Sequence, residues 1–321
     1  MKNKTLHNSI YLWRIVFTSL IALLHFNNIY SLGYTRFDIV GGQYIAVEFF
    51  FIVSGYLMYK SFLNSKDKKS FFKEYSKKRF FRLFPIFISA LIINFFFYCN
   101  YNHMDIIHSF TLFIDCFFEF ILMSMSGLNN NIIINGPGWY VSALLISCFI
   151  ISYFLSYHEE SYTKFIMPIS IMIIYSYFYR KAGGIGVYSQ TEFFYLNHAL
   201  MRAIAGLNLG ILSYNLSNYI KKFNFNYLLL SIIEFLLFIS VIISSFIVER
   251  NNTDFVKILV IFLGVSIAFS HTFSLGRFIN FLIIKISAIT YSVYLTHNIW
   301  RTFIFPSWFT TDYYMSISLK R

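Results

Sequence analysis

Charged residues, proline and cysteine are all scarce in this chain of 321 residues, and each scarcity excludes a class of protein. Charged side chains make up 12% of the residues, whereas soluble domains carry about 25%. A disordered chain would need far fewer apolar residues than this one has. Four prolines exclude a collagen-like chain, and three cysteines without paired spacing exclude a disulfide scaffold.

Apolar and aromatic side chains are present in excess instead. Apolar residues make up 57% of the chain and aromatic residues alone 22%, with 41 Phe and 25 Tyr. Soluble domains are about 45–50% apolar even when glycine is included, so no water-soluble core of this length needs so much apolar surface. The composition therefore predicts a polytopic membrane protein.

The apolar residues are grouped into runs that predict the fold class. A helix needs about 20 apolar residues to cross a hydrocarbon core about 30 Å thick, and about ten runs reach that length. The connections are short, so we expect an all-α transmembrane helix bundle of about ten spans. Residues 1–321 are expected to form a single membrane-embedded domain with no appended soluble domain. The runs cover residues 10–30, 41–62, 80–99, 106–126, 138–157, 164–180, 194–215, 226–247, 255–273 and 281–305.

Basic residues are concentrated between Lys60 and Arg82. Nine Lys and Arg stand there against two acids, which gives +7 of the net charge of +12. Short loops rich in Lys and Arg stay in the cytoplasm. This loop and the N-terminus, with Lys2 and Lys4, are therefore expected on the cytoplasmic side of the plasma (inner) membrane. Since the charge lies between two apolar runs, the expected partner is membrane lipid and not nucleic acid.

Two features of this topology stay open. Phe and Tyr alternate with lysine over residues 66–82, as in a basic helix that lies at the membrane surface, although a solvated loop can have the same composition. A count of ten spans also places Lys221 and Lys222 on the outer side, against the positive-inside tendency. Either one segment between residues 100 and 195 is re-entrant, or this pair is an exception.

Arg14 and His25 are the first functional candidates, because ionisable residues inside apolar runs are costly in lipid. They are eleven residues apart, so they share one helix face with a rise of about 16.5 Å between them. With Arg14 near the cytoplasmic surface, His25 is expected near the middle of the membrane. A neutral imidazole there can act as a general base. The alternative is a core histidine bonded to a neighbouring helix.

Arg79 and Arg82 form a second candidate pair. Residues three apart are neighbours on a helix surface, and two guanidinium groups at that spacing suit phosphate oxygens. The pair is expected at the cytoplasmic mouth of the third run, where it indicates a phosphate-bearing ligand that enters from the cytoplasm. Arginines that only reach back to lipid headgroups are the alternative.

Glu48 and Arg202 are further ionisable residues inside apolar runs. A lipid-facing carboxylate is improbable, so Glu48 is expected to pair with a cation or to line a wet cavity. Arg202 is expected to find an acidic partner where small residues let its helix approach a neighbour. Ser54 and Gly55 are small residues of the kind that usually mark close helix packing in membranes.

Six segments, in order along the chain, resemble the motifs of the acyltransferase-3 family of integral membrane acyltransferases. Each motif alone is weak, but six in the family's order are specific and cover nearly the whole chain. The segments are RIVFTSLIALLH from Arg14 to His25, AVEFFFIVSGYLM at 46–58, KKRFFRLFP at 77–85, NGPGWYVSALL at 135–145, MRAIAGLNLGIL at 201–212 and ITYSVYLTHNIW at 289–300.

The resemblance implies acyl transfer, with acetyl-CoA as the donor co-substrate and no metal. The acceptor it implies is a sugar hydroxyl of a cell-surface polysaccharide or of its lipid-linked precursor. The residues that the motifs carry are then expected to fall into three groups. Catalytic candidates are His25, Arg14 and Glu48; donor-binding candidates are Arg79, Arg82, Trp139 and Tyr140; candidates along the substrate path are Arg202, His297 and Ser54.

The chemistry agrees with this assignment. Acyl transfer from a thioester to an alcohol needs a base, stabilisation of the oxyanion, and two substrates held together. We expect His25 to be the base and Trp139 to lie near the acyl carbonyl, although a covalent acyl-histidine is an open route. The main alternative is a polytopic transporter or flippase of lipid-linked glycan, in which Arg79 and Arg82 would be membrane anchors.

Overall fold

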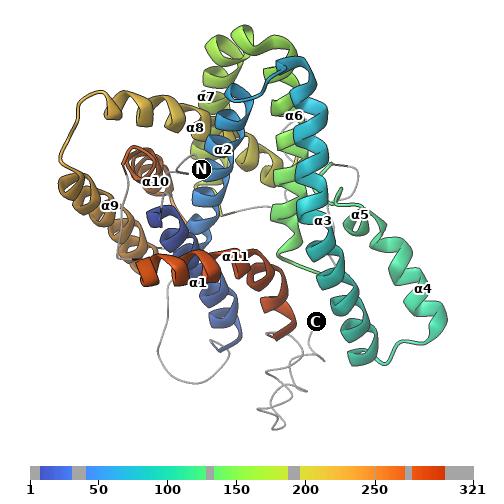
Figure 1. The fold of residues 1–321 in the computed structure, drawn as a ribbon. Helices are drawn as coiled ribbons and strands as arrows, with labels where there is room; N and C mark the ends of the chain where they lie inside the picture. The colour runs from blue at the N-terminus through green and yellow to red at the C-terminus, as the bar shows by residue number, and fades with distance from the viewer. Residues whose placement is uncertain are drawn as a thin grey trace.

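The predicted all-α class is confirmed by a computed structural model. It describes residues 8–30, 41–127, 134–186, 196–248, 250–271 and 277–300. Helices α2 and α8 lie at the centre of the bundle, with the other helices around them (Figure 1). The elements are α1 (Asn8–Tyr30), η1 (Gly42–Ile45), α2 (Ala46–Leu63), α3 (Lys68–Tyr101), α4 (Ile106–Asp115), α5 (Phe117–Phe120), α6 (Gly138–Ser161), η2 (Tyr162–Ile166), α7 (Met167–Tyr177), η3 (Phe178–Ala182), α8 (His198–Lys221), α9 (Tyr227–Ile247), α10 (Asp254–Ala268) and α11 (Arg277–Ile299).

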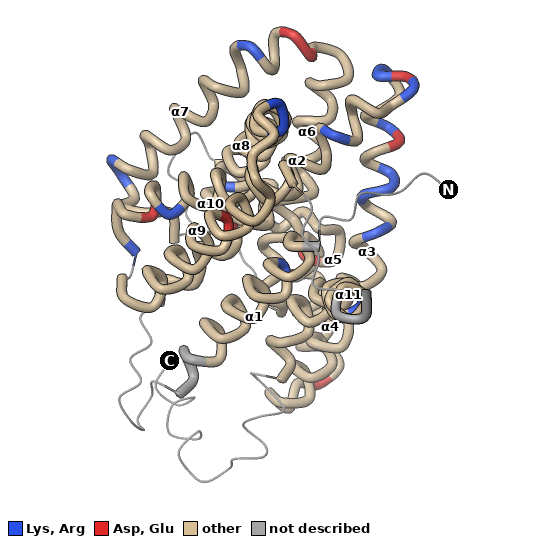
Figure 2. Tube along the Cα trace, turned by 60° about the vertical axis from the view of Figure 1, so that its left-hand side comes forward, with Lys and Arg blue, Asp and Glu red and all other residues tan. Residues whose placement is uncertain are grey.

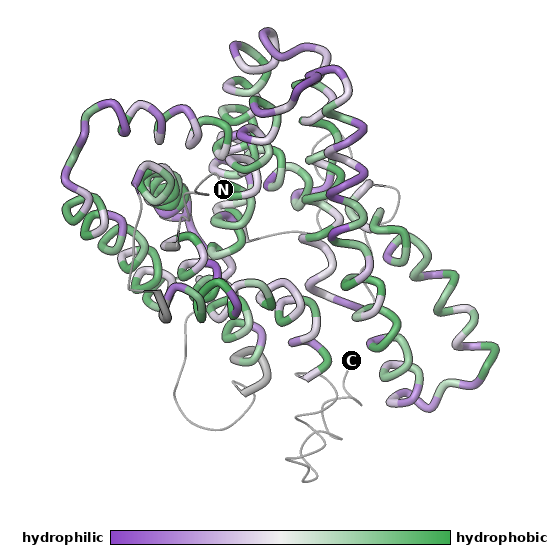
Figure 3. The backbone as a smooth tube through the Cα atoms, viewed as in Figure 1, coloured by the Kyte–Doolittle hydropathy of each residue, from purple (hydrophilic) through white to green (hydrophobic). Residues whose placement is uncertain are grey.

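Five helical segments are long and apolar enough to cross a membrane. The hydropathy of α9 shows the pattern well, since apolar residues continue along its length (Figure 3). These segments identify a multi-pass membrane protein, and a total of about ten spans stays a prediction. The five are Ser9–Phe26, Gly42–Leu63, Lys68–Tyr101, Gly138–Ala182 and Tyr227–Ile247.

Helices α2 and α8 run parallel to each other. Arg202, near the start of α8, pairs with Glu48, near the start of α2. Further along both helices, the hydroxyl of Ser217 lies 3.1 Å from that of Tyr56. Two helices in contact at matching positions from start to end have the same direction, so both begin at one end of the bundle and finish at the other.

Glycine makes this close pairing possible, as the sequence predicted for Gly55. A Cβ added to Gly55 would lie 2.0 Å from the carbonyl oxygen of Leu207, and one added to Gly210 would lie 2.2 Å from that of Ile52. No side chain fits at either distance. Small residues let membrane helices pack backbone against backbone, and that contact fixes the register of α2 against α8.

The parallel pairing places Lys221 at the same end as Lys60. Burial, together with the nearby positive charge of Lys60, lowers the pKa of Lys221. The placement of Lys221 and Lys222 at the opposite end from Lys60 is therefore wrong, while the total number of spans stays a prediction. We call the end defined by Lys60 and Lys221 the basic end, and the end where α2 and α8 begin the far end. The basic segments at the start of α3 and the end of α8 lie toward the same end of the bundle in Figure 2.

The expected span over residues 106–126 is too short to cross, which explains the error. The helix α4 has ten residues and α5 has four, whereas a span needs about 20. The chain turns at Cys116, and Phe113 and Phe120 both contact Phe95 of α3. This result agrees with the first alternative, a segment between residues 100 and 195 that does not cross.

The expected surface helix or loop over residues 66–82 is also corrected. Its residues from Lys68 onward form the first turns of α3, which continues unbroken to Tyr101 over 34 residues. Asp67 caps this helix by accepting hydrogen bonds from the backbone N–H groups of Lys69 and Ser70. The hydrogen bond from Lys69 is the main cause that lowers the pKa of Asp67.

Helix α6 runs to the basic end, and α7 then returns the chain to the far end. Glu159, near the end of α6, pairs with Lys68 at the basic end. The backbone leaves helical geometry at His158, near the end of α6, and the π-helical turn η2 then leads into α7. At the end of α7, the hydroxyl of Tyr177 lies 3.0 Å from Nε2 of His198, at the start of α8. The far end therefore holds the starts of α2 and α8 and the end of α7.

The first helix runs toward the far end. Phe17 of α1 stacks on Phe49, which lies near the start of α2, with 4.5 Å between ring centroids. Seven residues later, Leu24 lies beside Gly41, which precedes α2. Helix α11 lies across the second half of α1 (Figure 1), so α11 is placed to contribute side chains to whatever site α1 forms.

Candidate functional site

Three arginines from two helices lie close together, and of these Arg82 is exposed. Arg82 and Arg79 of α3 are both electrostatic neighbours of Arg14 of α1, and so are the phenols of Tyr140 and Tyr11. The structure therefore brings together two motifs that are far apart in the sequence. Three guanidinium groups in one region repel each other, so the region is suited to an anion that neutralises them.

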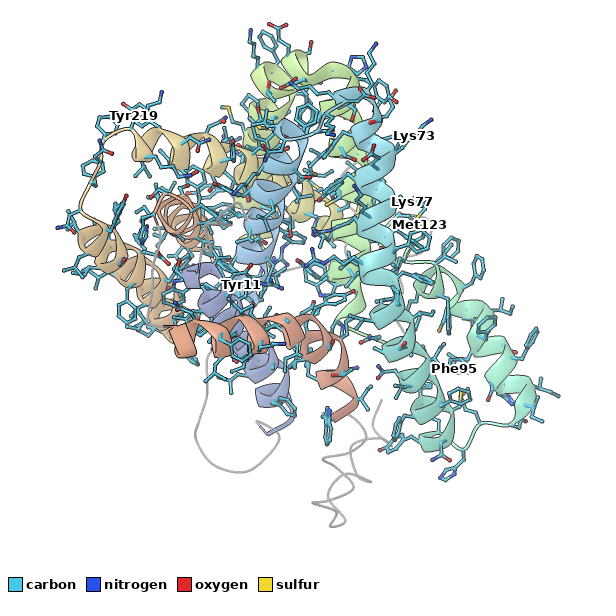
Figure 4. All side chains as sticks on the ribbon, in the orientation of Figure 1. Tyr11, Lys73, Lys77, Phe95, Met123 and Tyr219 are labelled. Carbon is cyan, nitrogen blue, oxygen red and sulfur yellow. The ribbon has the colours of Figure 1, made fainter. Side chains whose placement is uncertain are left out.

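Arg79 turns into the bundle, whereas Lys73 and Lys77 project from the exposed face of α3 (Figure 4). Its Nη2 donates a hydrogen bond to Oγ of Ser54 on α2, at 3.2 Å. Its buried Nε has no hydrogen-bond partner among the residues that the structure describes. Buried donors normally have an acceptor, so an unsatisfied guanidinium N–H indicates a ligand that supplies oxygen atoms.

Aromatic side chains form the walls around these arginines. The electrostatic neighbours of Arg79 include the phenols of Tyr75, Tyr140 and Tyr291 and the thiol of Cys148. Cys148 is fully buried, and its sulfur lies 3.8 Å from the hydroxyl of Tyr75. The region is therefore a positively charged space with apolar walls, in which an anion interacts more strongly than it does in water.

His25 forms a hydrogen bond with a second histidine, His297 of α11. The Nδ1 atom of His25 lies 2.7 Å from Nε2 of His297, and the ring centroids are 4.8 Å apart. One imidazole donates and the other accepts, so each fixes the tautomer of its partner. His25 is therefore bonded to a neighbouring helix, as the alternative of a core histidine expected. Its partner, however, is a second titratable group.

Backbone acceptors on neighbouring segments hold α11 in place at this point. The hydroxyl of Tyr294 donates to the carbonyl oxygen of Pro137 at 3.0 Å, and Tyr291 donates to that of Leu83 at 3.1 Å. Tyr294, one helical turn before His297, is buried. These bonds attach α11 to α3 and to the start of α6, so the position of the His297 ring is determined by three helices.

The contacts of α1 and α3 with α2 place these residues along the bundle. Ser54, to which Arg79 donates, lies midway along α2. Leu24 lies beside Gly41, ahead of α2. His25 therefore lies toward the far end of α2. Its expected position near the middle of the membrane stays a prediction.

Glu48 and Arg202 pair as the sequence predicted. The Nε atom of Arg202 donates to Oε1 of Glu48 at 2.9 Å, and both side chains are fully buried. The guanidinium carbon of Arg202 also lies 5.1 Å from the ring centroid of Trp139, a cation–π arrangement. Trp139, expected near the acyl carbonyl, thus packs on Arg202. Tyr140, the next residue, lies on the arginine side and hydrogen-bonds Ser54.

The structure also gives contacts for Glu119, an ionisable residue inside an apolar run that the sequence suggested for a polar path. Its two carboxylate oxygens accept hydrogen bonds from the backbone N–H groups of Ile134 and Asn135, both at 3.2 Å. The side chain of Asn135 in turn reaches the carbonyl oxygen of Leu295, two residues before His297. No pattern in the sequence relates residues 119, 135 and 295, so only the fold could reveal this support.

Within the residues that the structure describes, no group of three or more His, Cys, Asp or Glu side chains could hold a metal ion.

A multi-pass membrane protein in which α1 carries Arg14 beside two arginines of α3 and His25 beside a histidine of α11 is the class that this geometry defines. The sequence model of the family described as an acyltransferase domain matches residues 7–318. The chain belongs to this acyltransferase-3 family and is a membrane acyltransferase. No curated protein and no solved structure matches the chain.

Proposed function

We propose that the protein transfers an acetyl group from acetyl-CoA to a sugar hydroxyl of a surface polysaccharide or of its lipid-linked precursor. The observation that carries the proposal is the arrangement along α1. Arg14 lies among Arg79 and Arg82, and His25 follows on the same helix, about 16.5 Å further along. One rigid element therefore connects an anion site to a base.

The donor binds with its phosphates at the arginines. Arg79 and Arg82 supply planar donors that match phosphate oxygens, and Arg14 adds a third positive charge. The pantetheine arm of CoA is long, flexible and uncharged, so it can extend from the arginines past Tyr140 toward the far end. The thioester then lies near His25, and the acetyl carbonyl is within reach of phenol donors.

His25 acts as the base that removes the proton from the acceptor hydroxyl. The alcohol oxygen attacks the thioester carbonyl, the carbon–sulfur bond breaks, and CoA leaves as a thiolate that takes up the proton. His297 holds the His25 ring in one tautomer during this step. The pair Glu48–Arg202 and the ring of Trp139 serve as the rigid wall against which the acceptor is positioned.

The basic end faces the cytoplasm of the plasma membrane in this proposal. Short basic segments stay on the cytoplasmic side. Acetyl-CoA is a cytoplasmic metabolite, so it approaches from that side. The N-terminal Lys2 and Lys4, expected on the same side, lie outside the residues that the structure describes. His25, near the far end, is then accessible to an acceptor from the opposite leaflet.

The test uses membranes that contain the protein, acetyl-CoA labelled in the acetyl group, and a cell-surface glycan extract. We expect labelled, base-labile ester on the glycan with the wild type, and a loss of about 10²-fold or more with His25→Ala, the range for a general base. His108→Gln is the matched control, because that side chain is exposed and bonds Asp105.

Comparison of the surface glycan from cells with and without the protein separates the main alternative. A transporter or flippase would change the amount of surface glycan and leave its mass unchanged, whereas an acyltransferase leaves the amount and changes the mass by one ester group. Full transfer by His25→Ala membranes would contradict the assignment of the base.

A further inference from the structure

Glu234 and His271 form a buried pair of titratable side chains that the proposed chemistry does not use. Glu234 lies in α9, and His271 follows shortly after the end of α10. Both side chains are buried, and Nε2 of His271 lies 3.4 Å from Oε2 of Glu234. An ionisable group inside a membrane domain costs free energy, so the contacts of this pair need an explanation.

The carboxylate of Glu234 bonds two residues of α1. Nε1 of Trp13 donates a hydrogen bond to Oε1 of Glu234 at 2.7 Å, and the side chain of Ser9 also hydrogen-bonds this carboxylate. Residues four apart lie on one face of a helix, so both bonds hold the same face of α1 against α9. The Trp13 ring packs there on Phe238, with 4.7 Å between ring centroids. Two bonds one turn apart, together with this ring contact, fix the rotation of α1 about its own axis.

The imidazole of His271 is itself held at both nitrogens. Its Nδ1 lies 2.8 Å from the carbonyl oxygen of Ile267, and because a carbonyl oxygen only accepts, this nitrogen carries a proton. Its Nε2 lies 3.0 Å from the hydroxyl of Ser231, three residues before Glu234 on α9. The ring therefore has a fixed place beside the carboxylate. Through these contacts one carboxylate connects α1, α9 and the end of α10.

Arg14 follows Trp13 directly, so its direction depends on the same rotation. On a helix its side chain points about 100° away from that of Trp13. The main electrostatic neighbours of Arg14 are arginines and phenols, so Glu234 acts on it through α1 and not through its own charge. A rotation of about 20° moves the surface of a helix about 6 Å in radius by about 2 Å. A displacement of about 1 Å in a site can cost about 10²-fold in activity, so the position of Arg14 needs such an anchor.

We propose that Glu234 is a positioning residue for the donor site. By bonding two residues of α1 it sets the rotation of that helix, and thereby it keeps Arg14 beside Arg79 and Arg82, where one phosphate group can contact all three. This inference rests on the proposed function for the identity of the donor. It adds a residue on which donor affinity depends, on a helix that contributes no arginine to the site.

Trp13→Phe tests the anchor, because it removes the N–H donor and keeps an aromatic ring against Phe238. Binding of labelled acetyl-CoA to the full-length protein in nanodiscs is expected to weaken about tenfold, which equals about 1.4 kcal/mol. Ser213→Ala is the matched control. It removes a buried hydrogen bond to Ser266 of α10, 2.8 Å long, that does not involve α1. Its binding is expected to change less than about twofold, since separate sites act independently.

The comparison that separates positioning from mere stability adds Arg14→Gln. A positioning residue acts through Arg14, so Trp13→Phe is expected to weaken binding no further once Arg14 is replaced. A purely structural role would weaken binding by the same factor with and without Arg14. Such additive effects, or equal binding by the wild type and Trp13→Phe, would overturn the proposal.

Two variants of Glu234 itself keep the test independent of the tryptophan ring. Glu234→Gln retains a carbonyl oxygen for the Trp13 N–H and is expected to bind acetyl-CoA within about threefold of the wild type, since a neutral hydrogen bond is weaker than a charged one. Glu234→Leu has no acceptor and is expected to match Trp13→Phe. Equal binding by the two Glu234 variants would contradict the role of the hydrogen bond. The melting temperature of each variant in detergent shows that it is folded.

The same set of variants is measured with inorganic pyrophosphate, which tests the arginines without the acyl carrier. Coupling between Trp13 and Arg14 in pyrophosphate binding, in a protein that does not bind acetyl-CoA, would disprove the proposed function and support the positioning role. Binding of acetyl-CoA by the wild type without coupling for either probe would disprove the positioning role and leave the proposed function intact.

Discussion

At the scale of single residues, the hydrogen bond between His25 and His297 is the contact from which most of the proposed chemistry follows. An imidazole with one nitrogen engaged presents its other nitrogen in a fixed state. The bond spans 272 positions of the sequence, so the two motifs that carry these histidines have no visible relation in the sequence. His25 and His297 could each be singled out as an ionisable group in an apolar run, whereas their hydrogen bond could not be predicted.

His297→Ala is expected to lower acyl transfer about tenfold or more and to change its pH profile, because His25 would lose the group that fixes its tautomer. His297→Gln keeps an acceptor at a similar position and is expected to recover part of the rate. The measurement is initial transfer rate against pH with labelled acetyl-CoA. An unchanged profile in His297→Ala would show that His297 has only a packing role.

Arg79→Gln is expected to raise the KM for acetyl-CoA about tenfold, since it removes a charged donor from the phosphates, with a smaller change in kcat. Lys77→Gln is the control: it lies two residues earlier on α3, and its side chain is exposed. The comparison uses steady-state kinetics in nanodiscs. Equal KM values for the two variants would remove Arg79 from the donor site.

At the scale of elements, the parallel contact between α2 and α8 determines the register on which the pair Glu48–Arg202 depends. Gly210→Leu places a side chain against the backbone of α2, where a Cβ already lies 2.2 Å from the Ile52 oxygen. Overpacking of this kind costs about 1–3 kcal/mol or more. We expect a lower melting temperature of the purified protein in detergent.

Gly136→Ala is the matched control for that prediction, because no atom lies within 4 Å of a Cβ at this position. Its melting temperature is expected to match that of the wild type. A Gly210→Leu protein as stable as Gly136→Ala would mean that α2 and α8 are less closely packed than the structure indicates.

Element boundaries also show how much the sequence could predict. Long apolar runs, such as residues 10–30 and 226–247, correspond closely to α1 and α9. The run at 106–126 is equally apolar, yet it is broken at Cys116. Hydropathy measures whether a segment is stable in lipid, and it does not measure whether the chain turns back. The direction of every later helix therefore depended on a turn that composition cannot reveal.

At the scale of the whole molecule, the corrected direction of α8 has a direct consequence for topology. Cysteine introduced at Lys60 and at Lys221 is expected to react with an impermeant maleimide from one side of the membrane only, and cysteine at Lys181 from the other side. Labelling of intact cells and of inside-out vesicles measures this, with Cys99, Cys116 and Cys148 replaced by serine as the background. Labelling of positions 60 and 221 from opposite sides would contradict the parallel pairing.

The position of His25 along the bundle could not be predicted from the sequence. Charge patterns indicate which end faces the cytoplasm, and the periodicity of α1 gives the distance between Arg14 and His25. Neither shows where along the bundle the pair begins. That position comes from contacts such as Phe17 on Phe49, which exist only in the folded protein.

A single unbroken helix, α1, carries both Arg14 and His25, and it acts as a ruler. The separation of the two side chains cannot adjust to the cargo, because the helix has a fixed rise of about 1.5 Å and a fixed turn of about 100° for every residue. Under the proposed function, a carrier with a shorter arm cannot bring its thioester from the arginines to the imidazole. One residue inserted between positions 14 and 25 would turn the imidazole by about 100° to another face of the helix.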